Sequence, residues 1–243
     1  MNFVTLNTIT TDLLNIIRGA NVAQSERISK RQLEAWVHQY RALLLKQDLD
    51  KGKMPNPDYI QEIDHLFLEE VDLIGDNVLS DVFETDQHIS RSVLQLPKTI
   101  DLNHKPGLTY VGTVYGEELL FVPELRNRWQ RYKKYTSEDG VAFLRGQRLY
   151  VNNNPPLAYV SVRGIFENPV EVSRFVNPKT NQPYFNEDSA YPIPMNMVPI
   201  LKEMLLKQEL GIMAQAFSDD ETDAQHEVSS PAEGVKYTSY KRS

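Results

Sequence analysis

Hydrophobic positions in the first part of the chain recur with a helical period, which predicts a group of helices. Residues 10–12 precede an apolar run that ends at Gly19, as expected for a short helix. A second helix is predicted to begin at Ser29, because Ser29 and Gln32 have the spacing of a capping box. We expect one face of this helix to be buried. That face comprises Leu33, Trp36, Val37, Tyr40 and Leu44.

A third helix is predicted over 59–73, where Pro55 and Pro57 separate it from the second helix. Its apolar side chains would face inward, and the acidic side chains between them would face solvent. Three helices joined by short connections favour an antiparallel bundle. The inward residues are Ile63, Leu66, Phe67 and Val71, and the acidic face includes Glu62, Asp64, Glu69 and Glu70.

From Ile89 the hydrophobic period changes from helical to alternating, which predicts an inserted β-domain. Residues 108–122 and 141–151 each read as two short strands around a glycine-containing turn, so we expect two β-hairpins. The segment 157–166 alternates apolar and polar residues, as a half-buried strand does. Between the hairpins, a short helix is predicted over 124–135.

Helical periodicity returns near Met195 and continues to about Phe217. Asn196 is a suitable N-cap, and Pro199 would then lie in the first turn, where a missing N–H breaks no helical hydrogen bond. This helix is expected to complete the N-terminal bundle.

Beyond Phe217 the chain is polar, with few bulky side chains, and such a composition does not form a core of its own. We therefore predict an extended C-terminal arm. The expected fold is α+β: an antiparallel helical bundle with an inserted small antiparallel β-domain and this arm. Its parts would be the N-terminal helices (1–89), the β-domain (90–190), the C-terminal helix (191–217) and the arm (218–243).

The composition of the chain argues against several classes of function. The 243 residues carry a net charge of −7, which argues against a general nucleic-acid coat, because phosphate binding relies on clustered Lys and Arg. The absence of cysteine excludes disulfides, Cys-ligated zinc and thiol catalysis. The N-terminus lacks the basic segment of a signal peptide, and no apolar run is long enough for a membrane span. We expect synthesis and use in a cytosol-like compartment, without a membrane partner.

Catalytic motifs are absent from the sequence. Glu62 and His65 have the spacing of one half of a di-iron motif, but no second copy exists, so a surface or interface role for His65 is favoured. Gly107 and Gly112 are spaced like phosphate-loop glycines, yet the Lys and Ser or Thr of that motif do not follow. We predict neither an enzyme nor a cofactor or metal. A catalytic acid–base pair whose members are distant in the sequence and meet only in the folded chain stays open as an alternative.

A basic and aromatic cluster is the most specific feature of the chain. Such a cluster can bind nucleic acid through phosphate contacts and stacking. It can equally dock another protein, because Arg, Trp and Tyr are common interface anchors. The acidic chain favours protein docking, with a plain exposed helix as the other reading. The cluster comprises Arg126, Arg128, Trp129, Arg131, Tyr132, Lys133, Lys134 and Tyr135.

Several segments carry a further indication, and together they cover about residues 6–217 without a catalytic motif. They resemble virion structural proteins of crAss-like, short-tailed bacteriophages, of the kind that form rings between the portal and the tail. The segments are 29–42, 51–53, 102–105, Arg128 and Trp129 with Tyr132 and Tyr135, 162–169, and 191–210.

The resemblance implies a mechanical function in the virion neck or tail, after synthesis in the host cytoplasm. Copies would form a closed ring of about twelve, contact the portal and other tail proteins, and extend the DNA channel, with non-specific contact to packaged DNA. A ring needs two different patches, and opposite charge suggests the acidic face (Glu62, Asp64, Glu69, Glu70) and the basic cluster. The arm would grip a neighbour through Val235, Tyr237 and Tyr240. The alternative is a nucleic-acid-binding or regulatory phage protein that uses the basic cluster.

Overall fold

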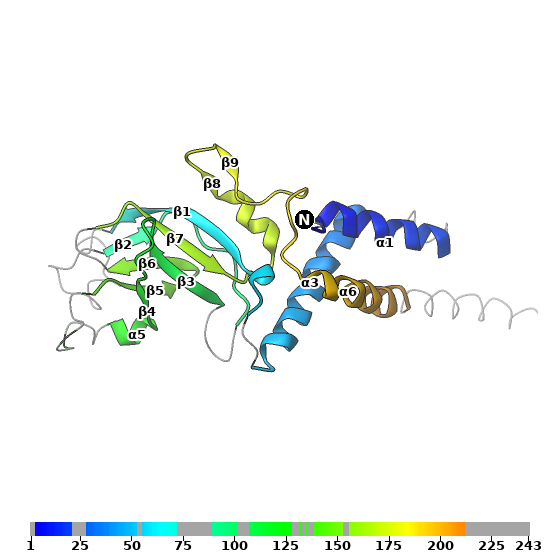
Figure 1. Cartoon of the computed structure of the whole chain (residues 1–243), viewed down its shortest axis with the longest axis horizontal. Helices are drawn as coiled ribbons and strands as arrows, with labels where there is room; N and C mark the ends of the chain where they lie inside the picture. Colours follow the sequence, from blue (N-terminus) through cyan, green and yellow to red (C-terminus); the bar gives the residue numbers. More distant parts are fainter. Residues whose placement is uncertain are drawn as a thin grey trace, which may run out of the picture. The chain divides into compact units, whose positions relative to one another are not determined.

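The computed structural model describes residues 3–20, 28–52, 55–71, 89–101, 107–127, 132, 135, 139–152 and 156–211. The chain divides into two compact units, 1–201 and 202–243, and each is described by itself. The first unit contains the sheet and the N-terminal helices (Figure 1).

A seven-stranded sheet dominates the first unit (Figure 1). The spatial order is β3-β7-β1-β2-β6-β5-β4, and neighbours are antiparallel except for the parallel pair β4 and β5. The two edge strands approach each other, because the Leu119 N–H donates to the Val111 carbonyl oxygen at 2.9 Å. The strands are β1 (Gln61–Glu70), β2 (Ile89–Ser92), β3 (Leu108–Thr113), β4 (Leu120–Phe121), β5 (Val141–Arg145), β6 (Arg148–Asn152) and β7 (Tyr159–Gly164).

The predicted fold class is therefore wrong. The chain has a mixed α/β fold built mainly on this sheet, with few helices in the described part, and not an antiparallel helical bundle with a small β insert. The prediction failed at residues 59–73, which were expected to form the third helix and instead contribute β1.

The register of β1 explains this error. Gln61 and Ile63 are buried, the pairing with β7 shifts between Ile63 and Leu66, and Leu66 and Leu68 are buried beyond the shift. Two alternating runs joined by an irregularity place apolar residues three apart, which imitates the helical period. Phe67, expected to face inward, is half exposed.

The two predicted hairpins have different outcomes. β5 and β6 form the second hairpin as predicted, and Gly146 and Gln147 both have positive φ, as a two-residue turn of this kind requires. The first hairpin is only partly present. The turn after β3 is closed by the Thr113 N–H, which donates to the Glu117 carbonyl oxygen at 2.7 Å, but β4 pairs with β5 instead of continuing along β3.

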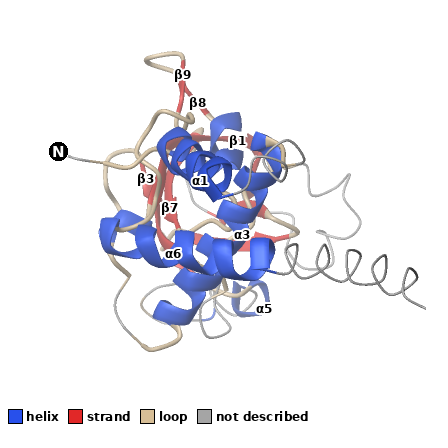
Figure 2. Ribbon diagram, turned by 90° about the vertical axis from the view of Figure 1, so that its right-hand side faces the viewer, coloured by secondary structure: helices blue, strands red, loops and turns tan. Residues whose placement is uncertain are grey.

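Two long helices lie to one side of the sheet, α1 (Leu6–Ala20) and α3 (Lys30–Leu49) (Figures 1 and 2). The predicted cap of α3 is confirmed, because the Gln32 N–H donates to Ser29 Oγ at 3.2 Å. The predicted inner face is buried except for Trp36, which is only half buried. Trp36 therefore retains some contact with solvent.

The C-terminal end of α3 packs against residues that flank the sheet. Leu45 and Leu49 of α3 form one buried cluster with Tyr59, Ile100 and Ile165. A second cluster lies within the sheet and joins Ile89, Phe143 and Tyr150, whose last two rings stack 5.3 Å apart. The contacts of Tyr59 hold the segment that leads into β1 against the C-terminal part of α3.

The remaining elements of the first unit are short. η1 (Pro57–Tyr59) leads into β1, α5 (Glu124–Asn127) follows β4, η3 (Pro169–Arg174) follows β7, and the hairpin β8 (Val176–Asn177) and β9 (Gln182–Pro183) precedes η4 (Met195–Met197). Helix α6 (Val198–Leu205) crosses the boundary between the units. Pro199 lies in its first turn as predicted, but Asn196, the predicted N-cap, lies within η4 and does not directly precede α6. In the second unit, Leu206–Leu210 continues as a π-helical turn, and the Lys207 ammonium pairs with Glu203 at 2.6 Å.

Candidate interaction surfaces

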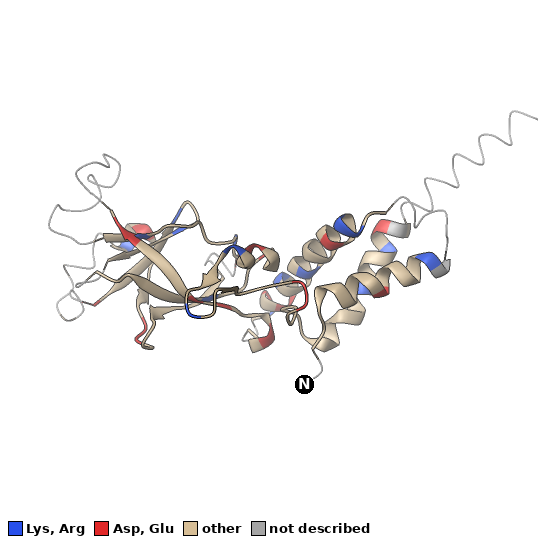
Figure 3. Ribbon diagram, turned by 90° about the horizontal axis from the view of Figure 1, so that it is seen from above, with Lys and Arg blue, Asp and Glu red and all other residues tan. Residues whose placement is uncertain are grey.

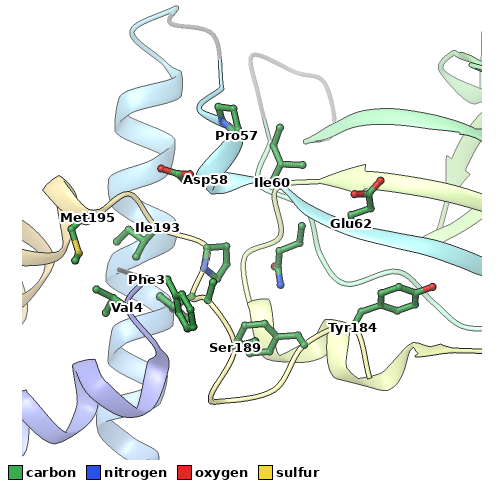
Figure 4. Close-up of a pocket in the computed structure, with 15 residues that line it drawn as sticks. Phe3, Val4, Pro57, Asp58, Ile60, Glu62, Tyr184, Ser189, Ile193 and Met195 are labelled. Atoms are coloured by element: carbon green, nitrogen blue, oxygen red, sulfur yellow. The ribbon is translucent and has the colours of Figure 1, made fainter. Parts of the chain in front are cut away.

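A pocket of about 460 Å³ opens where β1 begins, and we call it the β1-entrance pocket (Figure 4). Its walls come from the N-terminal segment, from η1 and the start of β1, and from 184–195. The Tyr191 N–H donates to the Val4 carbonyl oxygen at 2.8 Å, which holds two of these walls together. The apolar part of the lining includes Phe3, Val4, Ile60, Phe185, Ile193 and Met195.

The charged side chains that line this pocket are acidic. Asp58 and Glu62 both line it, and Asp58 is exposed. The Glu62 carboxylate accepts a hydrogen bond from Arg163 Nε, so its charge is already paired. Among the described residues, the Asp58 carboxylate has neither a hydrogen bond nor an ion pair. A partner with both an apolar and a cationic group would match this lining.

A second hollow of about 280 Å³ lies beside β1, and we call it the β1-side groove. Phe67, Leu94 and Val176 line it and are each about half exposed. Phe67 extends this apolar surface, because its ring makes an edge contact with Tyr159 at 5.4 Å. The other lining residues are His65, Leu66, Val93 and Phe175, so the lining carries no acidic or basic side chain apart from the imidazole.

The basic cluster predicted from the sequence is described only in part. Arg126 on α5, Tyr132 and Tyr135 are exposed, which agrees with a docking surface and equally with a nucleic-acid surface. Leu125, which the prediction omitted, is 75% exposed and stands beside Arg126. The other members lie outside the described residues: Arg128, Trp129, Arg131, Lys133 and Lys134.

The predicted acidic face lies on β1 and not on a helix. Glu69 accepts from Arg91 Nη2 at 2.6 Å and lies 3.8 Å from Arg148, and Glu62 pairs with Arg163. These pairs raise the pKa of Arg91 and Arg163. Basic and acidic residues are interspersed along the described ribbon (Figure 3). Two of the four predicted acidic residues, Glu62 and Glu69, are therefore matched within the chain, and Asp64 and Glu70 complete the predicted face.

The remaining predicted features concern His65, a metal site and the C-terminal arm. His65 lies on the strand β1 and not on a helix, and its Nδ1 is 2.9 Å from the Tyr184 hydroxyl. Within the described part of the chain, no three His, Asp or Glu side chains are grouped to hold a metal ion. The anchors predicted for the arm, Val235, Tyr237 and Tyr240, lie outside the described residues.

Residues 8–228 match the family described as phage tail ring protein 2, of crAss-like phages. The chain belongs to this family. No match to a curated protein was found. Since the match covers most of the chain, this phage tail ring protein is a structural component of the virion.

The family also agrees with the resemblance on which the functional prediction was based. A ring protein of a phage tail is expected to act as a homo-oligomer, and its description as a tail ring protein indicates a structural family. Among the helices that the structure describes, none combines the length and apolar character needed to cross a bilayer. Leu125 and Asp58 are surface residues that the sequence analysis did not single out. Leu125 could have been noticed, because it is an apolar residue next to the basic cluster.

Proposed function

We propose that this tail ring protein forms a closed ring of identical copies in the neck, between the portal and the tail. The observation that carries the proposal is the family match over residues 8–228. The ring would contain about twelve copies, so that it matches the portal beneath which it lies, and its lumen would continue the DNA channel. Its function would be mechanical, without catalysis or a cofactor.

The exposed apolar side chains of the first unit support ring formation. A closed ring requires two different patches on each copy, because the same operation must repeat from one copy to the next. The unit carries exposed apolar side chains at separate places: Leu125 on α5, Phe3 and Met195 at the β1-entrance pocket, and Phe67 in the β1-side groove. Exposed apolar patches of this kind are typical of protein interfaces.

The arm is proposed to strengthen the ring. Residues 218–243 contain few large apolar side chains, and Val235, Tyr237 and Tyr240 are isolated among polar residues. We expect these three side chains to be anchors on a neighbouring subunit or another tail protein, with the adjacent Lys and Arg residues placed on acidic surface. The acidic residues of β1 are proposed to face the basic cluster of the next copy, with Asp64 as a candidate.

Native mass spectrometry of the full-length chain tests this function. A closed ring predicts one dominant high-mass species with a fixed copy number at micromolar concentration. A chain that stays monomeric at every concentration, and also in the presence of its portal, would contradict ring formation.

A second function is supported by the exposure of Arg126 with Tyr132 and Tyr135, because cations beside aromatic rings suit nucleic-acid binding. Charge reversal of Arg126, Arg128 and Arg131 separates the two functions. Loss of assembly with a salt dependence supports docking, whereas lost DNA binding by a variant that still assembles supports the second function.

A further inference from the structure

We propose that the β1-entrance pocket receives Leu125 and Arg126 from a second copy of this chain, with Asp58 of one copy paired to Arg126 of the next. This inference rests on the proposed ring and names the contact that would close it. The evidence is the charge, the exposure and the placement of these three residues.

Asp58 is the acceptor in this contact. It lies in η1 at the rim of the pocket, and it is exposed. The other pocket carboxylate, Glu62, is already bonded to Arg163, and the described chain offers Asp58 no cation. Asp58 is therefore the pocket carboxylate whose charge is not compensated by any described residue of the same copy.

Arg126 is the matching cation on α5. Its neighbour Glu124 is directed to another residue, because its carboxylate lies 3.6 Å from Arg145 Nε. No ion pair of Arg126 occurs within the part of the chain that the structure describes, and the residue is exposed. An unmatched surface cation and an unmatched surface carboxylate on one chain are the pattern expected of two complementary patches.

Leu125 supplies the apolar half of the contact. It is 75% exposed, although burial of a large aliphatic side chain is energetically favourable. The pocket offers exposed apolar surface of its own, since Phe3 is 60% and Met195 54% exposed at its rim. Its volume of about 460 Å³ leaves room for one large side chain and a neighbouring guanidinium. Burial of Leu125 there would cover all three side chains.

The two patches cannot meet within one copy. The pocket lies where β1 begins beside α3 (Figure 4). Helix α5 lies at the far end of the sheet in the same unit (Figure 1). Contact between them must join different molecules, and each copy then has one patch left on either side. Such head-to-tail pairing generates a ring when its rotation closes.

The β1-side groove is the competing acceptor, and its chemistry fits less well. Its lining contains Phe67, Leu94 and Val176 but no carboxylate, so a guanidinium beside Leu125 would lose water without gaining a counter-charge. The β1-entrance pocket provides that counter-charge in Asp58. This difference makes the groove a suitable control position in the test.

A charge swap tests the pair directly. Asp58→Arg and Arg126→Asp should each weaken assembly of the full-length chain at least about tenfold, since like charges then face each other. The double variant should regain most of the assembly. Asp50→Arg is the matched control, because Asp50 is an exposed acid at the end of α3, and it should assemble like the unaltered chain. A double variant that assembles no better than the single variants would overturn the pairing.

Cross-linking between copies gives a second, independent test, because the chain has no cysteine. A chain carrying Leu125→Cys is mixed with one carrying Ala190→Cys, a position that lines the pocket and is exposed, and treated with a short bismaleimide. We expect a covalent dimer with this pair and little with Val176→Cys in the groove. Preferential linkage to Val176→Cys would overturn the pocket but leave the ring. An unaltered chain that never forms a high-mass species would overturn the proposed function itself.

Discussion

The guanidinium of Arg41 on α3 donates from Nη1 to the backbone carbonyl oxygen of Phe166, just beyond β7, at 2.8 Å. Its Nε donates to the Pro192 carbonyl oxygen at 2.7 Å, and its Cζ lies 5.6 Å from the centre of the Tyr191 ring. Arg41 is completely buried, and burial lowers its pKa to about 10, so it remains charged at neutral pH. One side chain thus joins α3, the end of β7 and the wall of the β1-entrance pocket.

Replacement of Arg41 should destabilise the fold. Arg41→Met leaves two buried carbonyl oxygens without donors, at about 1–3 kcal/mol each, while it removes the cost of a buried cation. We expect the free energy of unfolding to fall by about 2 kcal/mol, or about 4–8 °C in Tm. Arg31→Met, at an exposed position of the same helix, should change the Tm little. Thermal unfolding of both variants measures this, and equal Tm values would show that Arg41 does not clamp these segments.

Acid should weaken the same region through His38. Burial and the nearby Arg41 cation lower the pKa of His38 to about 4, and its Nδ1 lies 2.8 Å from the Tyr191 hydroxyl. The unfolded chain therefore binds this proton first as the pH falls below about 6.5. The contribution of neutral His38 is complete above pH 6.5 and is lost progressively down to pH 4, by up to about 3 kcal/mol.

His38→Gln provides the comparison for this pH dependence, because the amide does not titrate and can still bond Tyr191. Urea unfolding at several pH values should show a steeper loss of stability between pH 6.5 and 4 for the unaltered chain than for the variant. Parallel curves would mean that His38 titrates normally in the folded protein.

A side chain at Gly107 should disrupt the packing of Gly107 against the backbone at Ile100 and Ile165. A Cβ there would overlap the Ile100 carbonyl oxygen and lie 3.1 Å from that of Ile165, both of which are backbone atoms. We expect Gly107→Ala to cost about 1–3 kcal/mol. Gly211→Ala, which meets open space in a helix, should cost nothing measurable. A Gly107→Ala variant as stable as the Gly211→Ala variant would refute this account of the packing.

Removal of the arm should separate folding from assembly. A chain that ends at Phe217 should remain folded, with a Tm close to that of the full-length protein, because residues 218–243 are not expected to contribute to a core. We expect it to assemble less stably, as measured by native mass spectrometry. Unchanged assembly of the shortened chain would exclude the arm from the interface.

Local signals in the sequence predicted some elements well. The cap at Ser29 and the turn at Gly146 and Gln147 depend on neighbouring residues alone, and both are present in the structure. β1 was mistaken for a helix because its alternation is interrupted between Ile63 and Leu66, and that irregularity depends on pairing with β7, about 100 residues away in the chain. This segment accounts for one of the helices wrongly assigned to the bundle, and its strand lies in the middle of the order of the seven-stranded sheet.

Contacts of the surface residues with distant parts of the chain could not be predicted from the sequence either. The sequence indicated that the segment with Arg126 is exposed, because cations and aromatics alternate there. It did not indicate that Glu62 and Glu69 already have cationic partners, since Arg163 and Arg91 come from other strands. Nor did it indicate that Asp58 borders a pocket, whose walls are joined only in the folded chain.

The most direct test of the central claim is an electron cryo-microscopy map of the tail assembly that contains this chain. The account predicts a closed ring of identical copies on the tail axis next to the portal, with about twelve copies around the channel. A map that places the chain away from the axis, or as isolated copies that do not touch one another, would contradict it.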